Sequence, residues 1–539
     1  MAVVIPHSVL AAGWIPFVVI IVLAFLFSWF YIRYYQSRHD SEVSSTLTAI
    51  AALAITLLTS ALVPVDIFLV SYMKTPDGHF KSWAADNQTR QSIEDAVLYS
   101  YYALYCAVMV FAFLLIPFMY FFYEEKDEDS TCRSRCCAAL KFTVAFIIVA
   151  AILLLIGALA PLSAPPAKNS TDWERLHFLF NELGSNHGED AISFAISSLT
   201  LLGMLALITY TAYGMTALPF TWIKGVRAAK RERLEVCEDR EDLEERRNRL
   251  HVKYQDGRRM TNRDRKEMDE LDEKLHLLRR RERHLLSAER SWLNKCFIVC
   301  RPFQMVFGIV FILLALIIFV SLLLSCIDRI LHGLGYKMGY ALPKPQLPNP
   351  VDIVMVNTQK VFPLDYILIS AIIMYWVFCS MAGIKQMGIW FFWIRMYKIR
   401  VQRTRPQALL FMCMILMLIV LTNNIMLYTL SPQYVTFGSQ HYWQNETNHA
   451  TNETFATLLP CNLNATQAEC TMTRMSTLTT RFFYKVWFFG ACYYWGTWGF
   501  LGIFVLGFIV SIVKGRRSAI EDEVESDDSD DSDEELLRA

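Results

Sequence analysis

Nine apolar stretches, each long enough to cross a lipid bilayer, constrain the fold of this sequence more than any other feature. A membrane-spanning helix needs about 20 apolar residues, because the hydrocarbon core of a bilayer is roughly 30 Å thick. The stretches lie near residues 14–32, 47–72, 97–123, 141–162, 191–219, 303–327, 361–384, 408–430 and 484–513. Buried helices of a soluble protein are the alternative, but nine of this length in one chain argue against them. We therefore predict an all-α polytopic integral membrane protein with nine transmembrane helices.

The composition agrees with this class. Of the 539 residues, 54% are hydrophobic and 19% are charged, so the chain is more apolar than an ordinary soluble enzyme. The formal net charge is +0, and no overall field favours nucleic acid as a partner. Charge is segregated instead, with basic residues in "RVQRTRPQ" and in residues 224–302, and acidic residues in "EDEVESDDSDDSDEE".

The first apolar stretch sets the expected orientation. No Lys or Arg precedes it and Arg33 follows it, which disfavours a cleaved signal peptide and favours an uncleaved helix with a lumenal N-terminus. Nine crossings then place the C-terminus in the cytosol. The loops expected in the lumen are residues 73–96, 163–190, 328–360 and 431–483.

The segment between the seventh and eighth stretches supports this orientation. "KQMGIWFFWIRMYKIRVQRTRPQ" carries basic residues and no acid, as the positive-inside rule expects of a cytosolic segment. Its "IWFFWIRMYKI" part is too short to cross the membrane. We expect this part to be an interfacial amphipathic helix that contacts membrane lipid.

Glycan acceptor sequences and cysteines point to the lumen independently. Each N-x-[ST] sequence falls in a loop expected there, where N-glycosylation takes place. The five sites are Asn87, Asn169, Asn445, Asn452 and Asn464. Of 13 cysteines, only Cys461 and Cys470 lie in such a loop, and two cysteines in an oxidising compartment are expected to form a disulfide. Two free thiols are the alternative.

The charged segment 224–302 separates membrane helices 1–5, in residues 1–223, from membrane helices 6–9, in residues 303–513. Apolar residues recur in it at helical spacing on both sides of the turn signal Asp256-Gly257. They are Leu243, Leu250, Met268, Leu271, Leu275, Leu278 and Leu285. We predict a cytosolic helical hairpin with a coiled-coil-like seam. Its "RRRERH" stretch is either a site for anionic lipid or an acidic partner, or a solvated helix face.

Residues 514–539 are predicted to be a disordered acidic cytosolic tail. Eleven acidic residues lie between Glu521 and Glu535, with almost nothing apolar. The tail ends on Leu536 and Leu537, which resemble an acidic dileucine sorting signal, except that Ser532 stands where the pattern has an acid. We hypothesise that a phosphate on Ser532 supplies the missing charge. A merely solubilising tail is the alternative.

The sequence points away from an enzyme. It has no G-x-x-x-x-G-K-[ST], H-E-x-x-H, dinucleotide-binding or G-x-S-x-G pattern, so we expect no catalytic residue, no metal site and no enzyme cofactor. Asp66 and Asp365 are notable because carboxylates within membrane spans are candidate functional residues. They share a local pattern beside Pro64 and Pro363, and we expect both near the lumen as equivalent kinked segments around a cleft. The alternative is that each caps or kinks its own helix.

Several stretches resemble one family. "DIFLVSYMK", "TYTAYGMTALP", "VFPLDYILI", "SMAGIKQMGIWFFWIRMYKIR" and "RTRPQALLF" resemble the limb-region and lipocalin-receptor-like family of polytopic membrane proteins, across essentially all predicted spans. The resemblance implies a nine-helix protein of lysosomal and plasma membranes. It also implies that the chain assists the export of cobalamin (vitamin B12) to the cytosol, as an escort for an ABC transporter of subfamily D.

The resemblance further implies a link to clathrin adaptors and endocytic vesicles through Tyr-based and Trp-based motifs. Here "RERLEV" has Arg231 where a sorting Tyr would stand, and Phe297 follows Trp292 by five residues in place of three. Both departures disfavour direct adaptor binding by those motifs. A non-catalytic escort is the leading interpretation. A cell-surface endocytic receptor of the lipocalin-receptor type and a stand-alone transporter are the alternatives.

Overall fold

Nine helices in the described part of the chain are long and apolar enough to cross a membrane. The computed structural model describes residues 7–37, 42–75, 77–125, 132–159, 187–227, 229–254, 261–290, 292–333, 335, 340, 342, 346–359, 361, 363–391, 394–447, 454–461, 469–485, 487–516 and 518. The spans are Val18–Tyr35, Val43–Tyr72, Asn87–Glu124, Cys132–Leu153, Phe194–Lys224, Cys300–His332, Leu364–Met387, Pro406–Leu430 and Phe488–Val513. The predicted number and order of spans are therefore confirmed.

The chain forms two compact units. The first comprises residues 1–215 and 314–507, and the second comprises residues 216–313 and 508–539. Three helices contribute residues to both units, and they are α8 (Ala212–Lys224), α11 (Trp292–His332) and α17 (Trp487–Val513). Because α11 begins at Trp292, the last part of the predicted 224–302 insert belongs to a membrane helix.

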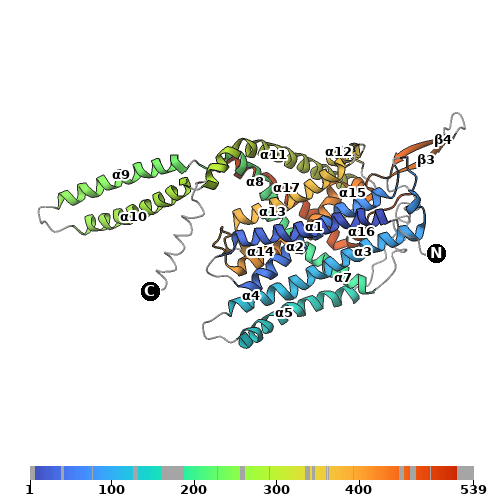
Figure 1. Cartoon of the computed structure of the whole chain (residues 1–539), viewed down its shortest axis with the longest axis horizontal. Coiled ribbons are helices and arrows are strands. Elements are labelled where there is room, and N and C mark those ends of the chain that lie inside the picture. The colour runs from blue at the N-terminus through green and yellow to red at the C-terminus, as the bar shows by residue number, and fades with distance from the viewer. Residues whose placement is uncertain are drawn as a thin grey trace. The chain divides into compact units, whose positions relative to one another are not determined.

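The first unit is a bundle of membrane helices around α14 (Figure 1). The other long helices that lie wholly in this unit are α1 (His7–Tyr35), α2 (Val43–Tyr72), α3 (Asn87–Val110), α5 (Cys132–Leu159), α7 (His187–Ala206) and α13 (Leu364–Met387), and the short helix α4 (Ile116–Glu124) continues from α3. In α14 (Pro406–Leu430), 83% of the span is buried, against 11% for Cys132–Leu153 in α5. A helix that is apolar all round can be buried on all sides, so α14 forms the core of the bundle.

Two π-helical turns interrupt the bundle helices, and one of them packs closely on α13. They are η2 (Phe111–Leu115), between α3 and α4, and η3 (Leu207–Thr211), between α7 and α8. A Cβ atom added at Gly214 would lie 1.9 Å from the carbonyl oxygen of Cys379, and one at Gly383 would lie 2.0 Å from that of Tyr210. Only glycine allows backbones to approach this closely, as in other membrane helix interfaces. The hydroxyls of Thr211 and Ser380 are 2.8 Å apart across the same contact.

The helix predicted within 389–399 is wrong, because the segment forms a β-hairpin. Strand β1 (Ile389–Phe391) pairs antiparallel with β2 (Ile394–Tyr397). Helix α13 ends at Met387, and the φ of 77° at Gly388, the next residue, lies in the left-handed region that favours glycine. The aromatic and β-branched residues that follow suit a strand, and the amide of Trp390 donates to Tyr210 Oη at 3.1 Å.

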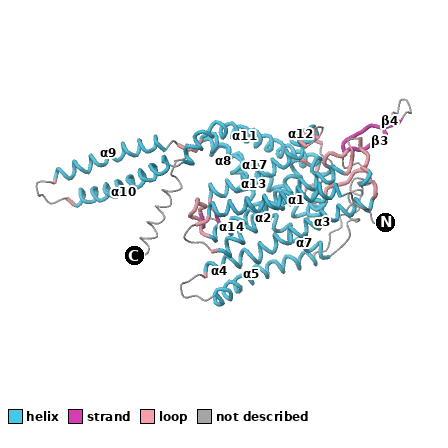
Figure 2. Tube along the Cα trace, in the orientation of Figure 1, coloured by secondary structure: helices cyan, strands magenta, loops and turns pink. Residues whose placement is uncertain are grey.

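Irregular and short elements gather at the end of the first unit where α2 ends, and we call them the end cap. The end cap comprises η1 (Ser82–Ala84), α12 (Pro350–Thr358), α15 (Pro432–Phe437), β3 (His441–Thr447), β4 (Thr454–Pro460) and α16 (Arg474–Lys485). Strands β3 and β4 pair antiparallel, from His441 opposite Pro460 to Thr447 opposite Thr454 (Figure 2). The lumenal loops of the sequence prediction therefore contain secondary structure of their own.

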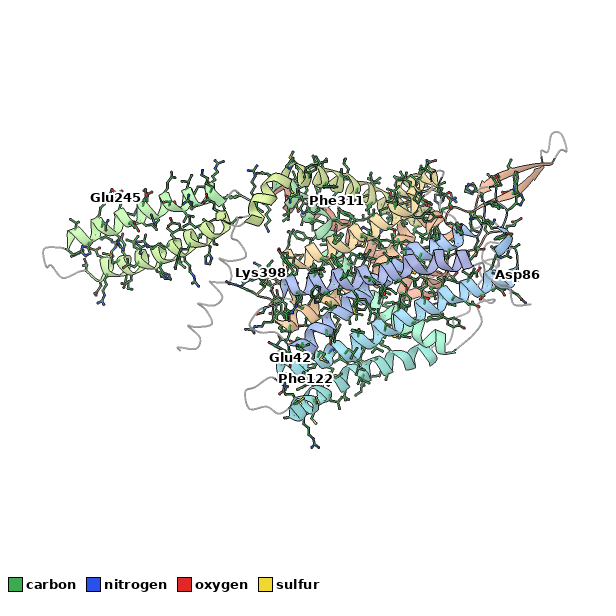
Figure 3. All side chains as sticks on the ribbon, in the orientation of Figure 1. Glu42, Asp86, Phe122, Glu245, Phe311 and Lys398 are labelled. Carbon is green, nitrogen blue, oxygen red and sulfur yellow. A yellow bond between two sulfur atoms is a disulfide. The ribbon has the colours of Figure 1, made fainter. Side chains whose placement is uncertain are left out.

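At the opposite end of the bundle, Arg135 of α5 connects the ends of three helices. Its guanidinium donates to Glu42 at 3.2 Å and to the carbonyl oxygen of Phe122 at 2.8 Å, and it lies 4.2 Å from the centre of the Phe122 ring. Glu42 and Phe122 are labelled in Figure 3. One cation therefore connects the start of α2, the end of α4 and the start of α5.

The second unit contains the predicted helical hairpin. Helices α9 (Ala229–Lys253) and α10 (Asn262–Arg290) lie side by side (Figure 1). Leu271, Leu275 and Leu285 are buried, as the leucine spacing predicted, and Val236 of α9, which was not predicted, is buried with Leu285. Ion pairs cross the two helices, including Arg240 with Glu282 at 2.8 Å, Arg279 with Glu244 at 2.8 Å and Arg233 with Glu289 at 3.2 Å.

The base of the hairpin is bonded to the end of α17. Lys224 Nζ donates to the carbonyl oxygens of Ser511 at 2.7 Å and Ile512 at 2.8 Å. A cation at this position satisfies carbonyls that lack partners at a helix C-terminus. Beyond α17, Ser518 Oγ donates to Glu232 at 2.5 Å, so the start of the tail lies against the first turns of α9.

Candidate functional site

Among the residues that the structure describes, four aspartates are buried near the end cap, and they form the candidate functional site. Asp66 and Asp365, both predicted from the sequence, expose 1% and 2% of their surface. Asp328 and Asp352, which were not predicted, expose 2% and 8%. Burial of a carboxylate is costly unless its oxygens accept hydrogen bonds. The partners of each carboxylate therefore indicate what it does.

Asp66 lies near the end of α2 and caps a different helix. Its Oδ2 accepts a hydrogen bond from the amide of Met475 at 2.9 Å and another from Tyr101 Oη at 3.4 Å. Met475 lies in the first turn of α16, where backbone amides lack partners within the helix and a negative charge is favoured. The carboxylate of Asp66 therefore caps α16, and the expectation that it would cap its own helix is wrong.

Asp365 lies in the first turn of α13. Tyr434 Oη, from α15, donates to Asp365 Oδ2 at 3.0 Å. Pro363 is the N-cap residue of α13, whereas Pro64 lies inside α2, so the two Pro-Asp patterns are not equivalent kinked segments and that prediction is wrong. Both carboxylates nevertheless lie at the same end of the bundle. There the rings of Phe68 and Tyr366 meet edge to face, 5.2 Å apart.

Asp352 caps α15 from the neighbouring helix α12. Its Oδ1 accepts from Ser431 Oγ at 2.6 Å and from the amide of Tyr434 at 3.1 Å, and its Oδ2 accepts from the amide of Gln433 at 3.4 Å. Burial raises the pKa of Asp352, and the hydrogen bonds from Ser431, Tyr434 and Gln433 oppose this rise. Because Tyr434 also bonds to Asp365, one tyrosine connects α12, α15 and α13.

Asp328 connects the end of α11 to the segment that leads into α12. It accepts from the amide of Gln346 at 2.9 Å and lies 2.7 Å from His332 Nδ1. Asn349, the N-cap of α12, donates to the carbonyl oxygen of Leu430 at 2.7 Å. The sequence does indicate where α12 and α15 begin, since Asn349-Pro350 and Ser431-Pro432 are typical helix starts. These signals do not identify the carboxylate that caps each helix.

A disulfide and one glutamine hold the strands of the end cap. Cys461 and Cys470, the pair expected from the sequence, are joined and buried. The side chain of Gln440 donates to the carbonyl oxygens of Phe437 at 2.8 Å and Thr471 at 2.7 Å, and it accepts from the amide of Thr471 at 3.1 Å. The segments before β3 and after the disulfide are therefore fixed to each other.

Glycine at position 438 permits close contact between the end cap and α2. Its φ of 60° is left-handed, and a Cβ atom there would lie 2.0 Å from Ser71 Oγ. The same hydroxyl accepts from the amide of Ser439 at 3.0 Å. A side chain at position 438 would therefore separate the end cap from α2.

The loop after α2 contacts β3, which brings two glycan acceptor segments to one end of the bundle. Lys74 Nζ donates to the carbonyl oxygen of His441 at 2.9 Å, and Trp443 Nε1 donates to that of Asp77 at 2.8 Å. Asn87 is exposed in the first turn of α3, and Asn445 lies in β3. Outside the described residues lie Asn169, Asn452, Asn464, Ser532, Leu536 and Leu537.

Lys74, in the loop after α2, is a buried cation that contacts the end cap. Burial lowers its pKa to about 8; the charge of Glu469 opposes this fall, and that of Arg90 adds to it. The ammonium group lies 4.9 Å from the centre of the Phe80 ring. The lysine is therefore protonated at neutral and acidic pH, and it bonds β3 to the end of α2 throughout that range.

The arrangement as a whole fastens the end cap to the bundle. Asp66, Asp352 and Asp365 each accept hydrogen bonds from α15 or α16, or from the residues that precede α15. Among the described residues, no group of three or more His, Cys, Asp or Glu side chains is placed to hold a metal ion. The hydrogen bonds of these carboxylates therefore hold α15 and α16, the helices that follow α14, in place.

Comparisons with known proteins cover nearly the whole chain. The family model described as LMBR1-like membrane protein matches residues 13–300. The chain is 54% identical, over 99% of its length and 100% of the relative's, to a protein of Nematostella vectensis named "Probable lysosomal cobalamin transporter". It is 52% identical, over 97% of both chains, to proteins of Danio rerio and Homo sapiens named "Lysosomal cobalamin transport escort protein LMBD1". No solved structure matches the chain.

Proposed function

Because the chain belongs to the family of LMBR1-like membrane proteins, we propose that it is a non-catalytic escort in the export of cobalamin from lysosome to cytosol. The observation that carries this proposal is its similarity, along nearly the full length, to relatives named for lysosomal cobalamin transport. Cobalamin is the cargo of the pathway in this proposal, and the chain needs no enzyme cofactor.

The partner in this proposal is an ABC transporter of subfamily D. An escort requires a transporter to escort, and the sequence lacks a P-loop pattern with which to hydrolyse ATP. Nucleotide hydrolysis would then belong to the partner. The apolar helices on the outside of the bundle, such as α5, offer surface to lipid or to the helices of such a transporter.

The geometry of the buried carboxylates favours an escort over a stand-alone transporter. Carboxylates within membrane spans mark substrate paths when they face a water-filled cavity. Asp66 and Asp365 instead accept hydrogen bonds from Met475 and Tyr434 and hold the end cap. A structural use of these two residues suits a protein whose function is to bind and stabilise a partner.

The proposed orientation puts the end cap in the lysosomal lumen and the hairpin and C-terminal tail in the cytosol. The glycan acceptor sequences and the disulfide of Cys461 and Cys470 support this orientation, since both modifications belong to the secretory lumen. In this proposal the protein also passes through the plasma membrane and clathrin-coated vesicles. A signal at Leu536 and Leu537 would direct that traffic to an adaptor.

A cell-surface receptor for a carrier protein is the second candidate. The observation that favours it is the β3–β4 hairpin, which exposes 43% of Trp443 and 38% of Leu458 and is fixed at its base by the disulfide. Aromatic side chains on a rigid support are common at the centre of protein interfaces. A receptor of this kind would bind its ligand on β3 and β4 from outside the cell.

Cells that lack this chain test the proposal. We expect the subfamily D transporter to fail to reach lysosomes and cobalamin to accumulate there, with both defects reversed by the wild-type chain. Purification of the chain from lysosomal membranes should yield that transporter as a partner. Correct localisation of the transporter in the deficient cells would refute the escort function. Cobalamin transport by the purified chain alone in liposomes would support a stand-alone transporter instead.

A further inference from the structure

The helical hairpin has a groove on one side that its own two helices do not fill. The groove has a volume of about 530 Å³ and lies between α9 and α10. Its apolar lining consists of Leu243, Leu277 and Leu278, and Leu277 exposes 42% of its surface. An exposed leucine beside a buried seam indicates apolar surface that is available for a further contact.

The charges around this hairpin groove are predominantly basic. Its basic residues are Arg246, Lys274, Arg280 and Arg281, together with His284, whereas its acidic residues are Asp239 and Asp242. Within the described part of the chain, neither Arg246 nor Lys274 forms an ion pair, although ion pairs are common elsewhere on the hairpin. The groove therefore suits an acidic peptide that also carries an apolar side chain.

We propose that the acidic C-terminal tail of this same chain, residues 519–539, docks in the hairpin groove. The tail has 11 acidic residues between Glu521 and Glu535, followed directly by Leu536 and Leu537. Its acidic residues pair with the basic rim, and its two leucines cover Leu243 and Leu277. The charge and the apolar pair of the tail thus both match the lining of the groove.

The described residues place the tail within reach. Ser518 bonds to Glu232 of α9, and Glu232 lies about 10 Å along the helix axis from Asp239 at the near end of the groove, at roughly 1.5 Å per residue. Arg246 lies about 21 Å from Glu232 by the same measure. An extended chain spans up to roughly 3.5 Å per residue, so the segment after Ser518 is long enough to cover the whole groove.

The attachment makes docking favourable even if each contact is weak. A tethered peptide has an effective concentration on the order of millimolar, so a modest intrinsic affinity keeps it bound. Docking also covers Leu536 and Leu537, the residues of the predicted sorting signal. The tail is therefore held against the hairpin in one state and free for an adaptor in another.

Photo-crosslinking of the full-length protein in detergent tests this proposal. With p-benzoylphenylalanine in place of Leu277, we expect crosslinked peptides from residues 519–539 after proteolysis and mass spectrometry. The matched control carries the same probe at Val252, which is 65% exposed on the far end of α9, outside the groove and away from Glu232. We expect the control to give about fivefold less tail crosslink, because the docked tail does not contact that surface.

Charge reversal provides the second measurement. Arg246→Glu with Lys274→Glu should reduce the tail crosslink from Leu277 by about fivefold, because each exposed ion pair contributes modestly. Arg263→Glu with Lys266→Glu, both on α10 but outside the groove, should leave the yield unchanged. Raising the salt concentration to about 0.5 M should weaken the wild-type crosslink without any change of fold.

Three outcomes would overturn the proposal. One is an equal yield of tail crosslink from the probes at Leu277 and Val252. Another is a yield that changes with neither charge reversal nor salt. The third is a crosslink from Leu277 only to another protein, to lipid or to the tail of a second copy. The last would show as a species of twice the monomer mass. None of these outcomes bears on the escort function, which is tested through the transporter.

Discussion

The end cap and the helical hairpin both depend on charged side chains but use them in opposite ways. At the end cap, Asp66 of α2 and Asp352 of α12 are buried and accept hydrogen bonds from backbone amides and hydroxyls. In the hairpin, Arg240 and Glu282 are partly exposed and pair with each other. The loss of a buried acceptor leaves its donors unsatisfied, whereas an exposed pair can exchange its partner for water. The end cap is therefore fixed in one arrangement, and the hairpin is able to change its contacts.

The largest effect is expected from removal of a buried carboxylate. Asp352→Ala deprives Ser431 Oγ and the amides of Gln433 and Tyr434 of their acceptor in a buried place. Each unsatisfied buried donor costs about 1–3 kcal/mol, so we expect a loss of about 3 kcal/mol in the free energy of unfolding. Thermal unfolding of the purified protein in detergent measures it. Glu238→Ala, an exposed acid of α9, is the control and should change little. If both variants lowered the free energy of unfolding equally, buried acids of the end cap would matter no more for stability than exposed acids of the hairpin.

Removal of the disulfide should have the next largest effect. Cys461→Ser with Cys470→Ser opens a loop of nine residues in sequence separation, and cross-links of this length stabilise by about 2–3 kcal/mol. Hydrogen exchange should show faster exchange in β3 and β4 and no change in α9 and α10, because the disulfide belongs to the end cap alone. Faster exchange in the hairpin would mean that the two regions unfold together.

The two regions also differ in how much of them the sequence predicts. The hairpin could be predicted because Leu271, Leu275 and Leu285 repeat at helical spacing, and such a repeat needs only a partner helix of the same kind. The membrane spans could be predicted for the same reason, since a run of apolar residues is a local property.

The end cap could not be predicted, because its contacts join residues far apart in the sequence. Asp66 was recognised as unusual from its apolar surroundings, but nothing near it indicates Met475 as its partner. Asp352 was missed because it lies in a short helix within an expected loop, where an acid is ordinary. The β-hairpin at 389–397 was mistaken for a helix because basic and apolar residues at an interface fit both structures, and Gly388 decides between them through its left-handed backbone.

The stability of the end cap should also depend on pH, with an effect smaller than that of removing Asp352 or the disulfide. Burial raises the pKa of Asp352 above its usual 3.8, so the folded state binds a proton more readily than the unfolded state. The resulting stabilisation is complete below the unfolded value and is lost as the pH rises through the raised pKa. We expect the melting temperature of the wild type to rise on acidification from neutral pH, with a smaller rise for Asp352→Asn. An identical slope for the two proteins would show that Asp352 does not titrate in this range.

The smallest effect is expected for the ion pair between Arg240 and Glu282, which lie 2.8 Å apart and expose 26% and 19% of their side chains. A double-mutant cycle with Arg240→Gln and Glu282→Gln, read by hydrogen exchange in α9 and α10, should give a coupling of about 0.5–1 kcal/mol. The coupling should fall at high salt, since exposed charges are screened. The more exposed pair of Arg249 and Glu245 is the matched control and should give no measurable coupling. A coupling as large as the effect of Asp352→Ala, insensitive to salt, would mean that the hairpin is as rigidly fixed as the end cap. Its basic groove would then have little freedom to exchange partners, because charges that are locked to each other cannot be offered to a docking peptide.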